Sequence, residues 1–295
     1  MRDDTPSRTA QWVAAARGLG MLLPDDVRIA DDPYGVAFSS PRIARILEER
    51  NPRALATLPG LKTWVVYMQV RTRVLDDAVR AFVAGGGRQV VLLGAGFDCR
   101  ALRLPELADA QVFEVDHPAT QGHKLATLEA IGAMSPAEYV TWDFETRPLD
   151  ELPEALADAG HEPAEPTLTI WEGVTMYLTE PAIDASIRAI SDYSSPGSQL
   201  AMTYFARSRL KKPSLATRVV QAAVARIGEP WTWGWVPDEL PGYLEDRGWN
   251  LLDDIITAEA ARALLPAHLA SAIKAATDSR IALSVIPESI AIAQR

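Results

Sequence analysis

Cysteine and histidine are scarce in this chain of 295 residues, which has one cysteine and four histidines. A single cysteine excludes an intramolecular disulfide framework and a metal site built from several thiolates. The four histidines are scattered along the chain without the spacing of metal ligands. They are His117, His123, His161 and His268. We therefore expect a protein without a resident metal ion.

Positive charge is also in deficit, because 29 lysines and arginines face 39 aspartates and glutamates and leave a net charge of −10. A nucleic-acid backbone requires a basic face, so we expect no nucleic-acid partner. No apolar run approaches the length of a membrane span, so we expect no membrane partner either. The segment from Met1 to Pro6 lacks the apolar core of a signal peptide, which favours a cytoplasmic protein with a small-molecule partner. The oligomeric state stays open.

From residue 89 onward, short apolar runs alternate with helical patterns. The runs predict strands at 89–93, 111–115, 138–142, 167–171 and 199–204. The patterns between them predict helices at 101–108, 117–131, 149–159 and 180–193. The last two strands are expected at Trp249–Leu252 and Ser289–Ala293, whereas 278–287 is an apolar segment of undecided structure. Such alternation predicts an α/β fold, with a doubly wound, mostly parallel sheet of seven strands.

Two regions depart from this alternation within what we expect to be one domain, 1–295. Residues 1–60 are predicted to form a helical N-terminal cap that includes a turn at 31–35, and a long helix follows at 64–83. Residues 206–246 are predicted to be an insertion. We expect the two regions to form a lid over the ligand-binding edge of the sheet.

The insertion contains Trp231, Trp233 and Trp235, which are three of the eight tryptophans of the chain. In an extended segment, alternate residues point to the same side, so the three rings could share one face. They either fill a gap between a surface helix and the sheet or line a pocket for a flat, apolar substrate. The basic residues of 207–218 could hold an anionic substrate.

The segment Val90–Leu93 followed by Gly94-Ala95-Gly96 reads as a buried strand and a tight turn whose backbone can approach a ligand. A second apolar strand, about twenty residues later, carries Glu114 and ends in Asp116. We expect both acids to contact a ligand, and the one at the end of the strand is placed to hold the two hydroxyls of a ribose. The pattern predicts a nucleoside-containing cofactor.

The glycine spacing indicates which cofactor this is. A dinucleotide site requires a third glycine, but Cys99 occupies that position and Asp98 precedes it. The carboxylate of Asp98 would repel a pyrophosphate and would suit an ammonium group. S-adenosylmethionine (SAM) has a ribose, a sulfonium and an ammonium group and no phosphate. The alternatives are an NAD-dependent oxidoreductase, a SAM- or nucleoside-binding protein without catalysis, and an unrelated glycine turn.

Four motifs in order carry a resemblance to a known family. They are Val70-Arg71-Thr72-Arg73, Leu93 to Leu104 (LGAGFDCRALRL), Phe113-Glu114-Val115-Asp116 and Glu172 to Leu178 (EGVTMYL). The chain resembles the leucine carboxyl methyltransferase family of class I SAM-dependent methyltransferases, and its bacterial branch of polyketide O-methyltransferases in particular. The resemblance implies a Rossmann-like methyltransferase sheet.

The resemblance also implies a role for individual residues. Arg71 is expected to hold the carboxylate of SAM, and Glu172 its ammonium group. Asp116 is expected to accept the ribose hydroxyls, while Gly94, Ala95 and Gly96 lie under the methionine part. Asp143 is expected at the adenine amino group, with Phe144 on the ring. For Asp116 and Glu172 a helix cap is the alternative, and for Arg71 an ion pair with Asp76 or Asp77.

The acceptor side is less specific. Tyr177 either faces the methyl-transfer region or belongs to the core, and Arg28 is expected near the substrate. The implied activity is methyl transfer to a carboxylate or phenol oxygen of a small, aromatic, polyketide-type molecule of secondary metabolism. A carboxylate is already ionised and needs only alignment, whereas a phenol would profit from a base. Methylation of a protein C-terminal carboxylate is the other enzymatic alternative.

Overall fold

The computed structural model describes residues 6–39, 41, 59–144, 146–211, 213, 215–226, 229–271, 273 and 278–288. One sheet of seven strands runs in the order β3-β2-β1-β4-β5-β7-β6. The strands are β1 (Gln89–Leu93), β2 (Gln111–Asp116), β3 (Glu138–Thr141), β4 (Thr167–Trp171), β5 (Gln199–Phe205), β6 (Asn250–Ile256) and β7 (Ser279–Val285). Strand β7 is antiparallel to both of its neighbours, β5 and β6, and the pairs from β3 to β5 are parallel. The predicted fold class is confirmed.

The longer helices of the described part lie between these strands or before them. They are α1 (Arg8–Gly20), α4 (Pro59–Ala84), α6 (Pro118–Ala130), α8 (Glu180–Asp192) and α10 (Leu215–Arg226). The shorter ones are α5 (Arg100–Arg103), α7 (Leu152–Asp158), α9 (Arg207–Lys211), α11 (Leu240–Glu245), α12 (Thr257–Leu264) and α13 (Ala267–Ala270). Short 3-10 turns occur at η1 (Gly35–Phe38), η2 (Pro105–Leu107), η3 (Leu149–Glu151), η4 (Thr175–Tyr177) and η5 (Pro237–Glu239). No helix within these described ranges is both long and apolar enough to span a membrane.

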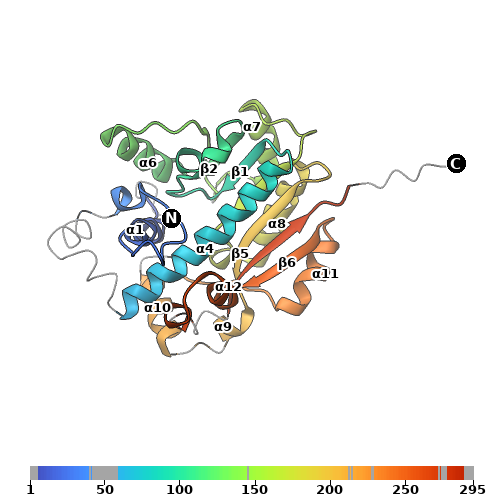
Figure 1. Cartoon of the computed structure of the whole chain (residues 1–295). Helices are drawn as coiled ribbons and strands as arrows, with labels where there is room; N and C mark the ends of the chain where they lie inside the picture. Colours follow the sequence, from blue (N-terminus) through green and yellow to red (C-terminus); the bar gives the residue numbers. More distant parts are fainter. Residues whose placement is uncertain are drawn as a thin grey trace.

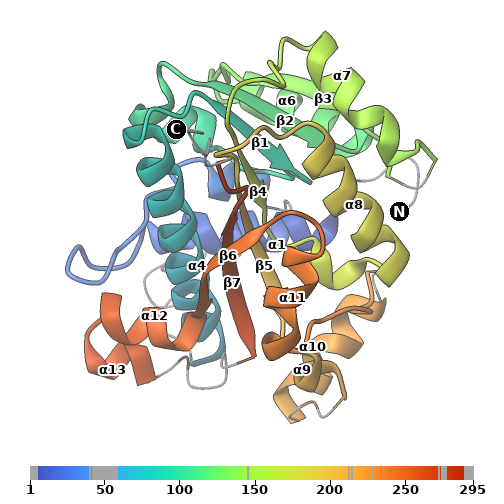
Figure 2. The same ribbon diagram turned by 90° about the vertical axis from the view of Figure 1, so that its right-hand side faces the viewer.

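Successive side chains of a strand point to opposite faces of the sheet, and helices cover both of these faces. Val90 of β1 packs with Leu75 and Val79 of α4, which runs along one face (Figure 1). Val91 faces the other way and shares a core with Ile187 of α8. Figure 2 shows α4 and α12 on one side of the sheet and α8 and α11 on the other. Because β1 is buried on both faces, its sequence is a continuous apolar run.

The structure corrects the prediction at the C-terminal strands. The seventh strand is Ser279–Val285, which lies inside the segment left undecided, and the predicted strand Ser289–Ala293 lies outside the described residues. Strand β6 extends to Ile256 rather than ending at Leu252. The side chains of β7 are buried or half-buried on both faces of the sheet, so the strand shows no clear alternation of apolar and polar residues. The pairing of β7 with β5 and β6, rather than the periodicity of its sequence, identifies this segment as a strand.

The predicted helix at 101–108 is also too long. Helix α5 ends at Arg103, and Leu104 is extended with φ −97° and ψ 106°. The cause is Pro105, because a proline disfavours helical geometry at the residue before it. The 3-10 turn η2 then completes the connection to β2.

The N-terminal region reaches the sheet through a close crossing of α1 and η1. A Cβ atom added to Gly18 would lie 2.3 Å from the backbone nitrogen of Val36, and one added to Gly35 would lie 2.3 Å from the Ala14 carbonyl oxygen. The predicted turn at 31–35 is present, and Oδ1 of Asp32 accepts the backbone N–H groups of Tyr34 and Gly35. Most of the remaining predicted cap, residues 42–58, lies outside the described residues.

The insertion 206–246 follows β5 directly. It contains α9, α10, an extended segment at 229–236, η5 and α11. Leu240 and Leu244 of α11 are fully buried against the sheet, so this last part belongs to the core. Only the part before it is available for a lid.

Candidate functional site

The predicted glycine turn lies at the C-terminal end of β1. Gly94 and Gly96 have φ angles of 69° and 53°, which is a backbone region that favours glycine. A Cβ atom on Gly94 would lie 2.6 Å from Cγ2 of Val174, so this position has no room for a side chain. The N–H groups of Gly94 and Ala95 both donate to the Val115 carbonyl at the end of β2. These bonds fold the turn over the end of the second strand.

Asp116, the last residue of β2, faces this turn. Its two carboxylate oxygens accept the backbone N–H of Gly96 at 2.5 Å and that of His117 at 2.6 Å. Burial raises the pKa of Asp116, and these two N–H groups offset part of the rise. The cap of helix α6 is His117, whose Nδ1 accepts the N–H of Ala119. The remaining lone pairs of Asp116 are therefore available for a ligand hydroxyl.

Arg71 of α4 and Glu172 at the end of β4 form an ion pair. Nε of Arg71 donates to Oε1 of Glu172 at 2.7 Å, and both side chains are buried. Burial alone would raise the pKa of Glu172, but the guanidinium groups of Arg71, Arg100 and Arg17 hold it well below its usual range. Among the described residues, only Nε of this guanidinium has a hydrogen-bond partner. Its two terminal nitrogens have no hydrogen-bond partner in that part of the chain, and their N–H groups can donate to a ligand carboxylate.

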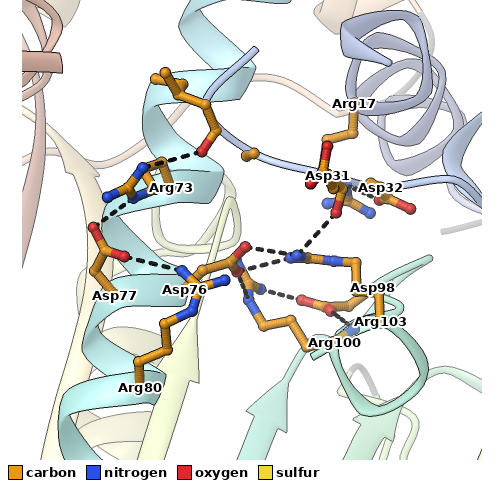
Figure 3. A network of polar contacts seen from close by, with 12 residues as sticks. Arg17, Asp31, Asp32, Arg73, Asp76, Asp77, Arg80, Asp98, Arg100 and Arg103 are labelled. Carbon is orange, nitrogen blue, oxygen red and sulfur yellow. Dashed lines mark hydrogen bonds and ion pairs between the residues drawn. The ribbon is translucent and has the colours of Figure 1, made fainter. Parts of the chain in front are cut away.

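The structure excludes the alternative ion pairs of Arg71, because Asp76 and Asp77 pair with other arginines. Asp76 accepts from Arg100 and Arg103, as Figure 3 shows. Asp77 accepts from Arg73 at 2.7 Å and from Arg80 at 2.9 Å. These pairs occupy successive turns of α4, so the sequence alone could not decide which arginine meets which aspartate.

Arg100 is fully buried and was not predicted as part of the site, although it lies inside the quoted glycine motif. Its guanidinium contacts the carboxylates of Asp76, Asp98 and Glu172. Asp98 also accepts the backbone N–H of Arg100, the first residue of α5, at 2.7 Å. The structure therefore corrects the prediction for Asp98, since its carboxylate is bound to Arg100 rather than presented to a ligand.

Arg17 brings helix α1 to the same place. Nη2 of Arg17 donates to the Phe97 carbonyl at 2.6 Å, and its Nε pairs with Asp32 at 2.8 Å. Burial raises the pKa of Asp98, but Arg100 and Arg17 more than reverse this and lower it. The N-terminal region thus supports the back of the glycine turn.

Glu114 also has a structural partner. It lies two residues before Asp116 on the same side of β2, and its carboxylate pairs with the buried ammonium group of Lys124 from α6. Burial raises the pKa of Glu114 to about 7, although Lys124 opposes the rise. Lys124 also donates to the backbone carbonyl of Asp98, so the Glu114–Lys124 pair supports the segment that follows the glycine turn. The expectation that Glu114 contacts the cofactor is corrected accordingly.

Asp143 and Phe144 follow β3, beside the same edge. The N–H of Trp142 donates to the Asp116 carbonyl at 2.8 Å, which continues the β2–β3 pairing to this point. Phe144 is 36% exposed, which is unusual for phenylalanine and leaves its ring accessible to a flat ligand. Oδ2 of Asp143 accepts the hydroxyl of Thr146 at 2.7 Å. Both residues remain candidates for the adenine side of a nucleoside.

Tyr177 lies in η4, just after Glu172 along the chain. It is half-buried, and burial raises the pKa of its phenol, with Thr9 of α1 as a hydrogen-bond partner. The N–H of Thr232 donates to the Met176 carbonyl at 2.7 Å, so the insertion is fastened to this turn. Glu229 accepts hydroxyl hydrogen bonds from Ser7 and Thr9. Helix α1, η4 and the insertion therefore meet around Tyr177.

The three predicted substrate-binding tryptophans have different surroundings. Trp235 is 2% exposed and contacts Tyr204 and Tyr243 edge to face, so it belongs to the core. Trp233 is half-buried, with its ring centroid 5.9 Å from that of Trp235. Trp231 is half-buried and contacts Phe205 at the end of β5, with 4.7 Å between ring centroids. The core-filling interpretation holds for Trp235, whereas Trp231 contacts the end of β5 and precedes Thr232, which is hydrogen-bonded to η4.

The structure places Arg28 elsewhere. It pairs with Asp25 and Asp31 at 2.9 Å each and lines a surface cavity of about 590 Å³ between α4 and η2. No residue of the glycine turn is among those that line this cavity, so the predicted contact of Arg28 with the substrate is not supported. Within the described part of the chain, no cluster of His, Cys, Asp and Glu side chains is placed to hold a metal ion.

Known proteins of similar fold agree with this architecture. A protein of the DUF574 family from Streptomyces avermitilis superposes with a TM-score of 0.60 at 18% identity, covering 92% of this chain and 97% of that one. A second structure, of a predicted methyltransferase from Thermobifida fusca, gives 0.57 at 18% identity and covers 92% and 98%. At such identities these structures speak for the fold alone.

Sequence relatives are more informative. A predicted SAM-dependent methyltransferase of Streptomyces coelicolor is 36% identical over 181 residues, so the match spans 61% of this chain and about three fifths of that protein. One from Frankia alni is 34% identical over 248 residues, which is 82% of each chain. The family model for leucine carboxyl methyltransferase matches residues 10–191, more than half of the sequence. The chain therefore belongs to the leucine carboxyl methyltransferase family.

Proposed function

We propose that this protein transfers the methyl group of SAM to a carboxylate or phenol oxygen of a small, aromatic, polyketide-type molecule. That the protein is a SAM-dependent methyltransferase follows from its family and from relatives above 30% identity. The more specific part of the proposal is that the acceptor atom is oxygen, that the protein acts in secondary metabolism and that it is cytoplasmic. It rests on the site and on the resemblance of the motifs.

One observation carries the proposal, namely the charge pattern at the C-terminal edge of the sheet. Arg71 and Glu172 lie 2.7 Å apart, and each can bind one end of an amino-acid zwitterion. Asp116 offers a carboxylate where a ribose would lie, at the end of the second strand. The turn between them carries the buried carboxylate of Asp98, whose partner Arg100 is already shared among three carboxylates. This arrangement suits a nucleoside linked to an amino acid and opposes a pyrophosphate.

The local backbone fits such a cofactor. The lack of room at Gly94 keeps the turn free of side chains, so its backbone can lie against the methionine part. SAM, when bound, supplies an electrophilic methyl group to a nucleophilic oxygen. Arg71 would then exchange one hydrogen bond with Glu172 for a two-point contact with a carboxylate, for which a guanidinium is well shaped. Glu172 keeps Arg100 as a partner at 2.8 Å, so it stays ionised and can accept an ammonium group.

In this proposal the phenol of Tyr177 acts as a hydrogen-bond donor. A phenol whose pKa is raised by burial stays protonated at neutral pH, so it can donate a hydrogen bond but cannot accept a proton as a base. This favours an acceptor that is already ionised. The protein then supplies alignment and exclusion of water, and α1 and the insertion close the space around Tyr177.

The test is incubation of the protein with deuteromethyl-labelled SAM and a panel of aromatic carboxylic acids and phenols, followed by mass spectrometry. Mild alkali separates the products, because it releases the label from a methyl ester and leaves it on an aryl ether. Label on an acceptor oxygen supports the proposal. Label on nitrogen or carbon contradicts it. If SAM and S-adenosylhomocysteine bind but no small acid, phenol or peptide carboxylate takes the label, the non-catalytic binding alternative is favoured. Label on a peptide C-terminus favours the protein-modifying alternative.

A further inference from the structure

Arg209 of α9 differs from the buried arginines Arg17, Arg71, Arg100 and Arg103, each of which is paired with a carboxylate. Its side chain is half-buried, and no described carboxylate forms an ion pair with it. Its Nε is buried without any hydrogen-bond partner within the described ranges. Burial therefore lowers the pKa of Arg209, and Tyr67 and Asp278 offset only part of this effect.

Two aromatic rings take the place of a carboxylate. The guanidinium carbon of Arg209 lies 4.5 Å from the ring centroid of Phe205 and 5.4 Å from that of Trp231. These two rings meet at an interplanar angle of 65°, so they form two walls beside the cation. A cation–π contact contributes about 0.5–2 kcal/mol, which is less than the several kcal/mol that burial of an ion costs. The cation is thus positioned but not neutralised.

The surroundings of Arg209 connect it to the candidate site. Phe205 ends β5, and the neighbouring strand β4 ends at Trp171, just before Glu172, so Phe205 and Glu172 lie at the same edge of the sheet. Tyr67 interacts electrostatically with Arg209. The ring centroid of Tyr67 also lies 5.9 Å from the guanidinium carbon of Arg71. Trp231 precedes Thr232, whose N–H is bonded to η4 beside Tyr177.

The neighbouring arginine of α9 shows the contrast. Nε of Arg207 donates to the Gly234 carbonyl at 3.0 Å, and its guanidinium lies over Trp233 at 5.0 Å. Arg207 therefore holds the insertion against the end of β5. Arg209 has the same kind of aromatic support, but its Nε has no hydrogen-bond acceptor in the described part of the chain, and no described carboxylate pairs with its guanidinium.

We propose that Arg209 is a specificity-determining residue that binds a carboxylate of the acceptor, with the half-buried Trp231 receiving a planar ring attached to it and the buried Phe205 supporting the cation from behind. A guanidinium matches a carboxylate through two parallel hydrogen bonds, and the aromatic walls supply flat apolar area. The acceptor class is then an aromatic carboxylic acid rather than a neutral phenol. This inference rests on the proposed methyl transfer and narrows its substrate.

The experiment uses the full chain and three pairs of probes. These are benzoate, 2-naphthoate and anthracene-2-carboxylate, each with its neutral primary amide. Their affinities are measured by calorimetry, with and without S-adenosylhomocysteine, for the unmodified protein and for Arg209→Gln and Arg209→Lys. The matched control is Arg226→Gln, which changes an exposed arginine at the end of α10 in the same insertion. Affinity for S-adenosylhomocysteine and the midpoint of urea unfolding report whether each variant is folded.

We expect the unmodified protein to bind at least one carboxylate tenfold more tightly than its amide. Arg209→Gln should remove this preference, Arg209→Lys should retain part of it, and Arg226→Gln should leave it unchanged. Amide binding and cofactor binding should stay the same throughout. If Arg209→Gln does not fold, the preference of the unmodified protein and its reduction in Arg209→Lys still decide the matter.

Equal binding of acids and amides, or no binding of any acid, would overturn the inference. So would unchanged carboxylate affinity in Arg209→Gln. Label transfer to the same probes separates this from the proposed function. Oxygen methylation that does not depend on Arg209 contradicts the inference alone. A carboxylate preference that depends on Arg209, with label on nitrogen or carbon, contradicts oxygen methylation alone.

Discussion

Two regions of this protein bury arginines in opposite ways. Beside the glycine turn, Arg71 and Arg100 meet the carboxylates of Asp76, Asp98 and Glu172 directly. In the insertion, the guanidinium of Arg209 lies beside the rings of Phe205 and Trp231 and forms no ion pair with a described carboxylate. The first region is a network of paired charges, part of which Figure 3 shows around Asp76, Asp98 and Arg100, whereas the second holds a cation that forms no ion pair with a carboxylate in the described part of the chain.

The difference indicates what each region is built to bind. A matched pair such as Arg71 and Glu172 can exchange its internal contact for the two ends of a zwitterion without a net change in buried charge. An unmatched cation gains most from an anion, because the anion supplies the missing charge. The cofactor side is therefore expected to be stable and selective by geometry, and the acceptor side to be selective by charge.

The largest expected effect is on the network. Replacement Arg100→Met leaves the buried carboxylates of Asp76, Asp98 and Glu172 without their shared cation, and we expect a loss of about 3–5 kcal/mol in the free energy of unfolding. The control Arg262→Met removes a cation that is 59% exposed and paired with Glu259, and should cost less than about 1 kcal/mol. Urea denaturation at neutral pH measures both. A similar, small cost for both variants would contradict the role of the network.

The second prediction separates the tryptophans. Trp235→Ala should destabilise the protein by about 3–5 kcal/mol, because it opens a cavity in the core beside Tyr204. Trp231→Ala should cost clearly less, since Trp231 is half-buried, and should weaken binding of 2-naphthoate instead. Thermal unfolding and calorimetry on both variants provide the comparison. Equal losses of stability with unaltered 2-naphthoate binding would assign both rings to the core.

The third prediction concerns the ribose end of the cofactor side. Asp116→Asn should weaken S-adenosylhomocysteine binding by about 1.5–3 kcal/mol, the usual value for a hydrogen bond to a charged group. Asp158→Asn, at an exposed position of α7, is the matched control. Calorimetry gives both affinities. An affinity of Asp116→Asn equal to that of the control would remove Asp116 from the cofactor site.

The fourth prediction uses pH to distinguish the two regions. The pKa values of Asp98 and Glu172 are lowered in the folded chain, so the unfolded chain binds more protons once the pH falls below their usual range. Their contribution to stability is therefore present at neutral pH and is lost as the pH falls through the lowered pKa values. Each tenfold difference in proton affinity between the folded and the unfolded chain is equivalent to about 1.4 kcal/mol.

Urea unfolding measured at neutral and acidic pH tests this. Glu172→Gln should show a smaller loss on acidification than the unmodified protein. Arg209→Gln should show the same loss as the unmodified protein, because no described carboxylate is paired with it. An altered acid dependence in Arg209→Gln would mean that the two regions share charges, and the comparison would fail.

The smallest effect is expected for Arg71→Lys, which retains the charge and loses the planar fork. We expect about tenfold weaker binding of S-adenosylhomocysteine, equivalent to about 1.4 kcal/mol. Arg188→Lys, at an exposed position on α8, is the control. Wild-type affinity in Arg71→Lys would show that Arg71 acts only as a partner of Glu172.

Much of the fold could be predicted because its signals are local. The five parallel strands are short apolar runs with helices between them, and the turn at Gly94 and Gly96 needs glycine for steric reasons. The position of β7 could not be predicted in this way. Its neighbours β5 and β6 come from distant parts of the chain, and only their pairing makes Ser279–Val285 a strand.

The same distinction applies to the site. The strand order read from the sequence by itself placed Asp116 and Glu172 at one edge of the sheet, and the resemblance of the motifs to the family placed Arg71 beside them. The sequence did not determine that Asp98 and Glu114 would be neutralised by Arg100 and Lys124. Nor did it distinguish Arg209 from the other cations of 207–218. Charge pairing depends on which side chains share a buried volume, and only the tertiary structure decides that.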